Sequence, residues 1–300
     1  MLAGYDMRNH VPIASCALAL AGCVSHDVGP AAPPSEARSL VQLEMVYTRA
    51  SAKVGLDAAA HFVRYRTTEP PLAADDAEQD KRALSSLLGL QHDDDLVAGT
   101  CRSVYQAQAS SPASLSDVVL LDAGSLTVRN AGAVELVLAP QHYPELLPFV
   151  SGVVYGEEGV QTRAPLPSAP IEIEAEGGED VGPFVAAARV PRAFPDLTVG
   201  RQEGELDLAW VAAQGAGTVL VDLRWGGAHA GSVRCRTTDE GHFSVSHASA
   251  ALALRIDDAL AQGSQVAVSV SRSEPAALDA PGVGAGRLLV TLRDTTILSP

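Results

Sequence analysis

The sequence has 300 residues, a hydrophobic content of 47 %, a formal net charge of −15 and an isoelectric point near 4.8. The hydrophobic content is sufficient for a packed core and excludes a disordered stalk. The acidic balance argues against nucleic acid or an anionic membrane face as the main partner.

The first feature in chain order is the apolar run Val11–Leu20, which is too short to span a bilayer and suits a signal-peptide core. It leads into Leu20-Ala21-Gly22-Cys23. This pattern resembles the lipobox of bacterial lipoproteins, in which the cysteine thiol receives a diacylglycerol, the preceding peptide is cut off and the new amine is acylated. The resemblance implies a signal peptide over residues 1–22 and a lipid anchor on Cys23. The other interpretation is a buried apolar segment with an incidental cysteine.

Two details of this region concern the start of the chain and its destination. A signal peptide carries net positive charge before its core, and Met7-Arg8-Asn9-His10 fits this better than the longer segment from Met1, which includes Asp6. We therefore favour Met7 over Met1 as the start of translation. Val24-Ser25 follows Cys23 without an aspartate, which by resemblance to lipoprotein sorting in Gram-negative bacteria indicates the outer membrane.

Residues 23–39 are expected to form an extended tether, because Gly29-Pro-Ala-Ala-Pro-Pro34 is rich in proline and alanine. Alternating apolar residues then predict strands over 41–47 and 60–67. The best helix candidate is Ala73–Leu90, where acidic residues come early and an apolar stripe follows.

Strand patterns dominate the rest of the chain. The expected strands, separated by turn residues, cover residues 118–121, 126–128, 134–138, 150–155, 171–175, 184–190, 206–210, 219–225, 233–235, 243–245, 266–270 and 288–292. A minor helix is expected near 248–260. This rhythm predicts a mainly β fold, an antiparallel β-sandwich that is either one large sandwich or two in tandem. Pro191–Pro195 is the expected joint between an N-terminal β-rich domain over 40–195 and a C-terminal β-sandwich domain over 196–300.

The cysteines agree with an exported protein. The lipobox resemblance implies that Cys16 leaves with the signal peptide and that Cys23 is lipidated, so Cys101 and Cys235 would remain as an even pair in an oxidising compartment. We predict a disulfide between Cys101 and Cys235, and the alternative is two buried free thiols.

Two segments carry a second resemblance. The stretch from Val233 to Val245, which follows a tryptophan-containing pair of strands, and the segment Gly99-Thr-Cys101-Arg102 are similar to parts of uncharacterised lipoproteins from myxobacterial-type genomes. The resemblance covers most of the mature chain. It implies a paired role for the two cysteines and brings no known activity with it.

Two clusters contain residue types that bind metals. Asp93-Asp94-Asp95 offers carboxylate oxygens for calcium but lacks the spacing of an EF-hand loop, so a solvated acidic loop is the favoured interpretation. Asp239, His242 and His247 could supply zinc ligands. His242 and His247 would point to opposite faces of a regular strand. We therefore favour turn-exposed histidines and predict neither a metal site nor a cofactor.

Two further patterns have a structural and a functional interpretation. Trp210 and Trp225 could stack on a sugar ring, but both are in phase with the apolar residues of their strands, which favours core packing. Gly282-Val-Gly284-Ala-Gly286 superficially resembles a nucleotide-binding loop. Because it precedes a strand and not a helix, we predict a flexible hairpin loop.

These features indicate a lipid-anchored envelope lipoprotein with a non-enzymatic binding or structural role. Its expected partners are the membrane, through the anchor on Cys23, and an envelope protein or glycan, with no nucleic acid. The alternative is a hydrolase of envelope or extracellular polymers that uses carboxylate chemistry. A concave pocket with convergent titratable side chains would favour the hydrolase, whereas a flat or grooved face with exposed aromatic residues would favour the binding module.

Overall fold

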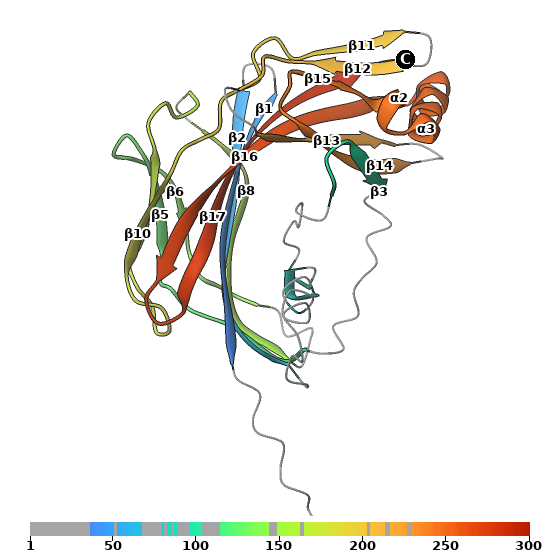
Figure 1. The fold of residues 1–300 in the computed structure, drawn as a ribbon. Helices are drawn as coiled ribbons and strands as arrows, with labels where there is room; N and C mark the ends of the chain where they lie inside the picture. Colours follow the sequence, from blue (N-terminus) through green and yellow to red (C-terminus); the bar gives the residue numbers. More distant parts are fainter. Residues whose placement is uncertain are drawn as a thin grey trace, which may run out of the picture. The chain divides into compact units, whose positions relative to one another are not determined.

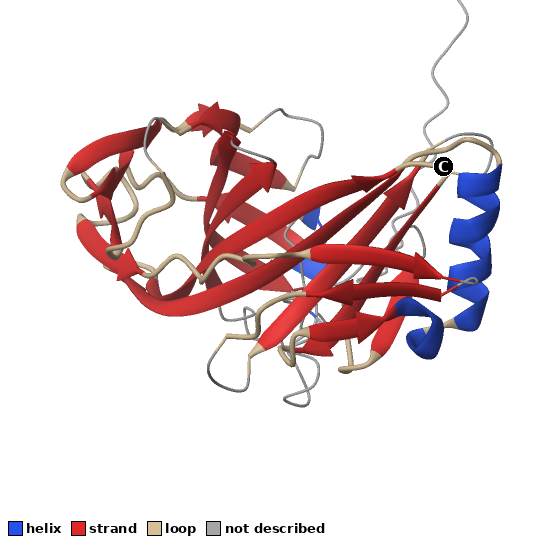
Figure 2. Cartoon of the chain, turned by 90° about the horizontal axis from the view of Figure 1, so that it is seen from above, coloured by secondary structure: helices blue, strands red, loops and turns tan. Residues whose placement is uncertain are grey.

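The structure is a computed structural model. It describes residues 37–50, 53–67, 80, 83–85, 87–88, 96–103, 115–143, 149–162, 165–202, 205–213, 217–226 and 230–300. Ser35–Pro300 forms one compact unit. The described chain is mainly β, which confirms the expected fold class (Figures 1 and 2).

The strands of the described residues form three sheets. The ten-stranded sheet has, in spatial order, β3 (Thr100–Ser103), β14 (Gly231–Thr238), β13 (Thr218–Trp225), β16 (Val266–Ala280), β17 (Gly284–Leu298), β1 (Arg38–Ala50), β2 (Lys53–Thr67), β4 (Leu115–Leu120), β8 (Val150–Gln161) and β7 (Gln141–His142). The four-stranded sheet has β10 (Phe184–Ala188), β9 (Ile171–Ala175), β5 (Leu126–Asn130) and β6 (Ala133–Leu138). The third sheet has β11 (Thr198–Gln202), β12 (Glu205–Ala209) and β15 (His242–Ser244).

Most neighbouring strands are antiparallel, as expected, but two pairs are parallel. β1 lies beside β17 in parallel, with Leu43 opposite Leu288 and Tyr47 opposite Leu292. β4 and β8 form the second parallel pair. The β1–β17 pairing joins the first strand of the unit to the last, so strands from both sides of the expected joint at 191–195 belong to one sheet.

Two apolar clusters cover one face of the large sheet. The first packs alternate residues of β1, β2 and β17 against the four-stranded sheet. The second packs β13, β14 and β16 against the three-stranded sheet and a helix. β16 and β17 form a long hairpin that contributes to both clusters (Figure 1).

The C-terminal helix near 248–260 is confirmed. The chain forms α2 (Val245–Ala248) and then α3 (Ala250–Ala261), and the side chain of Ser249 caps α3 by accepting a hydrogen bond from the backbone N–H of Leu252. One face of α3 is buried against the second cluster, beside the strand ends of the large sheet (Figure 2).

The expected helix over Ala73–Leu90 is described only in part. Residues 80, 83–85 and 87 are helical, and the N–H of Leu88 donates to the carbonyl of Leu84 at 3.0 Å. Leu84 is fully buried against Val63 and Tyr65, on the opposite face of the large sheet from the two main clusters. No helix in the described part of the chain is long and apolar enough to cross a membrane.

Candidate functional site

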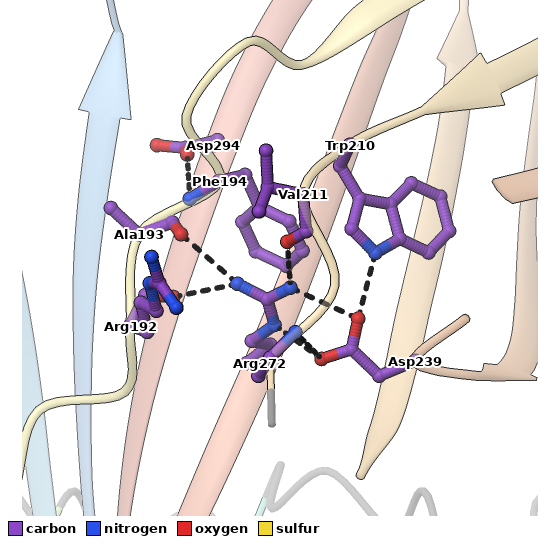
Figure 3. Close-up of polar contacts among 9 residues, drawn as sticks. Arg192, Ala193, Phe194, Trp210, Val211, Asp239, Arg272 and Asp294 are labelled. Atoms are coloured by element: carbon purple, nitrogen blue, oxygen red, sulfur yellow. Dashed lines mark hydrogen bonds and ion pairs between the residues drawn. The ribbon is translucent and has the colours of Figure 1, made fainter. Parts of the chain in front are cut away.

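A buried ionic junction lies between the two apolar clusters. Figure 3 shows polar contacts of this junction. Arg272 on β16 donates from Nε to Asp239 Oδ2 at 2.7 Å and from Nη2 to Asp239 Oδ1 at 2.9 Å. The two side chains are only 6 % and 1 % exposed. Asp239 lies in the turn after β14 and also accepts hydrogen bonds from Trp210 Nε1 at 2.8 Å and from the N–H of Ala213 at 3.2 Å.

The guanidinium of Arg272 also holds the segment between the two halves of the chain. Its Nη1 donates to the carbonyl oxygens of Arg192 and Ala193, both at 3.0 Å, and its Nη2 donates to Val211 O at 2.7 Å. The ring of Phe194 lies 4.0 Å from the guanidinium carbon. Together with the two bonds to the carboxylate, these contacts use every N–H group of the guanidinium.

A second arginine–carboxylate pair completes the junction. Arg49 on β1 donates from Nε and Nη2 to Asp294 on β17, both at 2.6 Å. Asp294 accepts a hydrogen bond from the N–H of Phe194 at 3.1 Å, and Arg49 donates to the carbonyl of Phe194 at 3.0 Å. The Arg49–Asp294 pair therefore holds the backbone of Phe194, and Arg272 packs against its ring.

The electrostatics of the junction fit a structural role. Burial by itself raises the pKa of Asp239, but the hydrogen bonds from Arg272, Trp210 and Ala213 outweigh this effect and lower the pKa below its usual value. The carboxylate therefore stays ionised and fully bonded. The junction connects β16, β17, β1 and the 192–194 segment, and its arginine donors point to protein acceptors.

The structure separates the residues that were considered as zinc ligands. Asp239 is committed to Arg272, whereas the imidazole of His242 is 61 % exposed and lies 3.9 Å from Asp207. His247 belongs to α2, and its side chain lies outside the described residues. Among the described residues, no three histidine, cysteine or acidic side chains are grouped closely enough to hold a metal ion. Asp93-Asp94-Asp95 and Cys23 lie outside the described residues.

Both tryptophans are core residues. Trp210 is 6 % exposed and Trp225 is 5 % exposed. The ring of Trp225 lies against Gly231, where a Cβ would overlap the indole. The glycine-rich segment makes a turn at residues 281–283 of the β16–β17 hairpin, which agrees with the hairpin prediction, and Gly284 and Gly286 already belong to β17.

Cys101 and Cys235 form a disulfide with an S–S distance of 2.04 Å. They lie directly opposite each other on β3 and β14, facing the second apolar cluster. The bond therefore fastens the short edge strand β3 to the large sheet.

The other face of this sheet edge carries arginines. Arg102 on β3 is exposed and directly opposite Arg234 on β14. Arg234 donates to Asp222 on β13 at 2.7 Å and 3.1 Å. Arg224 lies two residues further along β13 on the same face and is exposed. Among the residues that the structure describes, neither Arg102 nor Arg224 has an ion-pair partner.

Three hollows surround the same end of the sheet. The first has a volume of about 520 Å³ and is lined by Arg224 and Trp225, among others. The second, of about 410 Å³, is lined by Trp225 and Arg255 of α3. The third, of about 150 Å³, is lined by Arg255 and Arg102. Neighbouring hollows thus share a lining residue, and each contains an arginine. We define this region as the arginine end of the sheet.

The middle of this polar face is buried. A cavity of about 20 Å³ is lined by Glu44, Asp222 and Arg293, together with the hydroxyl groups of neighbouring strands. Its volume admits about one water molecule, so these two carboxylates cannot flank a sugar ring. The Nε of Arg293 is buried and makes no hydrogen bond, and burial lowers the pKa of its guanidinium.

His61 on β2 belongs to the same polar face, and burial lowers its pKa from 6.5 to about 4. Its Nδ1 is buried without a hydrogen-bond partner. The imidazole of His61 binds a proton more readily in the unfolded chain than in the folded one. Protonation of His61 therefore does not affect the free energy of unfolding above pH 6.5, but it lowers that free energy as the pH falls from 6.5 towards 4. We expect acidification across this window to cost about 3 kcal/mol through His61. In urea titrations, His61→Gln should remove this part of the acid sensitivity, whereas His142→Gln, at an exposed position on β7, should leave it unchanged.

The positive charge of Arg102 should destabilise the folded state. Like charges that lie directly opposite each other on paired strands destabilise a sheet. Arg102→Gln is expected to raise the free energy of unfolding by about 0.5 kcal/mol, and the gain should shrink at high salt because salt screens exposed charges. Urea midpoints at low and high salt measure this effect, with the exposed Arg189→Gln as the control. A loss of stability in Arg102→Gln would contradict the prediction.

No protein-family model, curated protein or solved structure matches this chain.

Proposed function

We propose that this chain is a lipid-anchored envelope lipoprotein with a non-enzymatic binding role, held by acyl chains on Cys23 at the outer membrane of a Gram-negative bacterium. The observation that carries the proposal is the lipobox Leu20-Ala21-Gly22-Cys23 ahead of a compact unit that begins at Ser35. Two or more lipid signals hold a protein stably on a membrane.

The binding role is supported by the hollows at the arginine end. Two of them, of about 520 Å³ and 410 Å³, fall within the range of ligand-binding clefts. They lie beside a sheet edge that the disulfide fastens and that α3 supports. A ligand at this end would meet a preformed surface.

The anchor is tested by the intact mass of the protein purified from membranes, before and after reduction and alkylation. We expect the mass of Cys23–Pro300 with three acyl chains, and two thiols that react only after reduction. Cys23→Ser should abolish acylation and leave the thiol chemistry of Cys101 and Cys235 unchanged. An unacylated wild-type chain that retains residues before Cys23 would refute the anchor.

A further inference from the structure

The arginine end combines exposed positive charge with an open surface, in a chain whose net charge is −15. Arg102, Arg224 and Arg255 are exposed. Arg255 lies over the ring of Trp225 at 5.7 Å from the ring centroid, and the other two make no ion pair among the described residues. Arg102 lies directly opposite Arg234, so its charge is not placed there to stabilise the sheet.

The three arginines are spread along the end of the large sheet. The three hollows follow one another around the end of the sheet through the shared residues Trp225 and Arg255. An arginine in each hollow suits a ligand that carries a negative charge on successive units, because each guanidinium can bind a carboxylate through two parallel hydrogen bonds.

The other polar side chains of the hollows suit hydroxyl groups. Gln265 and Ser232 line the 520 Å³ hollow, and Gln262 and Asp258 line the 410 Å³ hollow. Amide and hydroxyl groups offer both donors and acceptors, and the carboxylate accepts, so a sugar hydroxyl can both donate and accept here.

We propose that the arginine end binds an acidic polysaccharide, with Arg102, Arg224 and Arg255 on successive carboxylates and the neighbouring polar side chains on sugar hydroxyls. This rests on the proposed binding role, and it does not depend on the anchor. The repeated positive charge and the hydroxyl-binding groups of the hollows are the observations that set the ligand class.

The direct test is calorimetric titration of the purified full-length protein with polygalacturonate and with the same polymer after methyl esterification, which removes only the charge. We expect binding to the acidic polymer, none to the ester, and an affinity that falls as salt rises. Inorganic polyphosphate is the third probe, because arginines also bind phosphate.

The variants Arg224→Gln and Arg255→Gln should each weaken binding of polygalacturonate roughly tenfold. Arg102→Gln should also weaken it, although this variant is expected to fold more stably, so a loss of binding cannot come from unfolding. The control is Arg64→Gln with Arg189→Gln, which removes two exposed arginines from other parts of the surface and should leave the affinity unchanged.

The outcomes separate this inference from the proposed function. Equal binding of the acidic polymer and its ester would overturn the role of the arginines, but it would leave the proposed binding role of the protein intact. Binding of polyphosphate alone would overturn the polysaccharide as the ligand. An equal loss of affinity in the control variant would show only a general charge effect and overturn the site. Absence of binding to all three probes would overturn the inference. The mass measurement would still show whether Cys23 carries the lipid anchor.

Discussion

Asp239→Asn is expected to destabilise the protein by about 3–5 kcal/mol, because it leaves the guanidinium of Arg272 buried without its counter-charge. The side chain of Arg272 is 6 % exposed, so water cannot replace the carboxylate. Urea denaturation at neutral pH measures this change. The same carboxylate, with its lowered pKa, contributes stability above its usual pKa of 3.8 and loses it as the pH falls further.

A double-mutant cycle makes this result specific. Arg272→Met combined with Asp239→Asn should cost less than the sum of the two single changes, because no uncompensated charge stays buried. Glu174→Gln is the matched control, since its ion pair with Arg129 has side chains that are 51 % and 35 % exposed and should contribute less than about 1 kcal/mol. An unfolding midpoint of Asp239→Asn equal to that of the wild type would show that the junction does not stabilise the fold.

Replacing Cys101 and Cys235 together by serine should lower the free energy of unfolding by about 4–5 kcal/mol. The disulfide closes a long loop and so reduces the conformational entropy of the unfolded chain. The two residues are separated by 134 positions. Urea denaturation of the double variant measures this cost, and hydrogen exchange should show faster opening of β3 than of the central strands.

Reduction provides the control for the disulfide. A reductant should shift the unfolding midpoint of the wild type to that of the double variant and have no effect on the double variant itself. If neither reduction nor substitution moved the midpoint, the pairing of β3 with β14 would have to be maintained by its hydrogen bonds alone. Loss of β3 should also weaken the proposed binding of polygalacturonate, because Arg102 lies on that strand.

The strands of the C-terminal half could be predicted because every second residue faces the second apolar cluster. In β13, the residues Val219, Val221, Leu223 and Trp225 share the buried face of the second cluster, as their spacing indicates. Such a pattern defines the buried face of a strand but not its neighbour. The parallel pairing of β1 with β17 therefore could not be predicted, since it joins residues from opposite ends of the chain.

The junction carried a sequence signal that the strand prediction did not use. Arg272 follows Val266, Val268 and Val270 in the alternation that faces the core. Arg49 follows the buried residues of β1 in the same way. A charged residue in phase with a buried face requires a buried partner. The partners Asp239 and Asp294 come from other elements and required the fold.

The arginine end could be predicted only in part. The sequence contains Cys101-Arg102 and Arg234-Cys235, so a disulfide between the cysteines already brings the two arginines together. The position of Arg255 depends on how α3 packs against Trp225, which the periodicity of the helix does not define. Edge strand β3 was missed because its four residues include two polar and one charged residue.

The pairing of β1 with β17 has a mechanical consequence. In sequence, β1 is the first strand after the proposed anchor, and it is hydrogen-bonded to β17 on one side and to β2 on the other. Because the two terminal strands are parallel, a pull between the chain ends acts along both strands and loads the hydrogen bonds between them together, in shear. Force spectroscopy should show a higher rupture force in this direction than for a pull that peels β3 from the sheet edge in its reduced form. A protein held by its N-terminal end would then resist tension along β1 and β17 without unfolding.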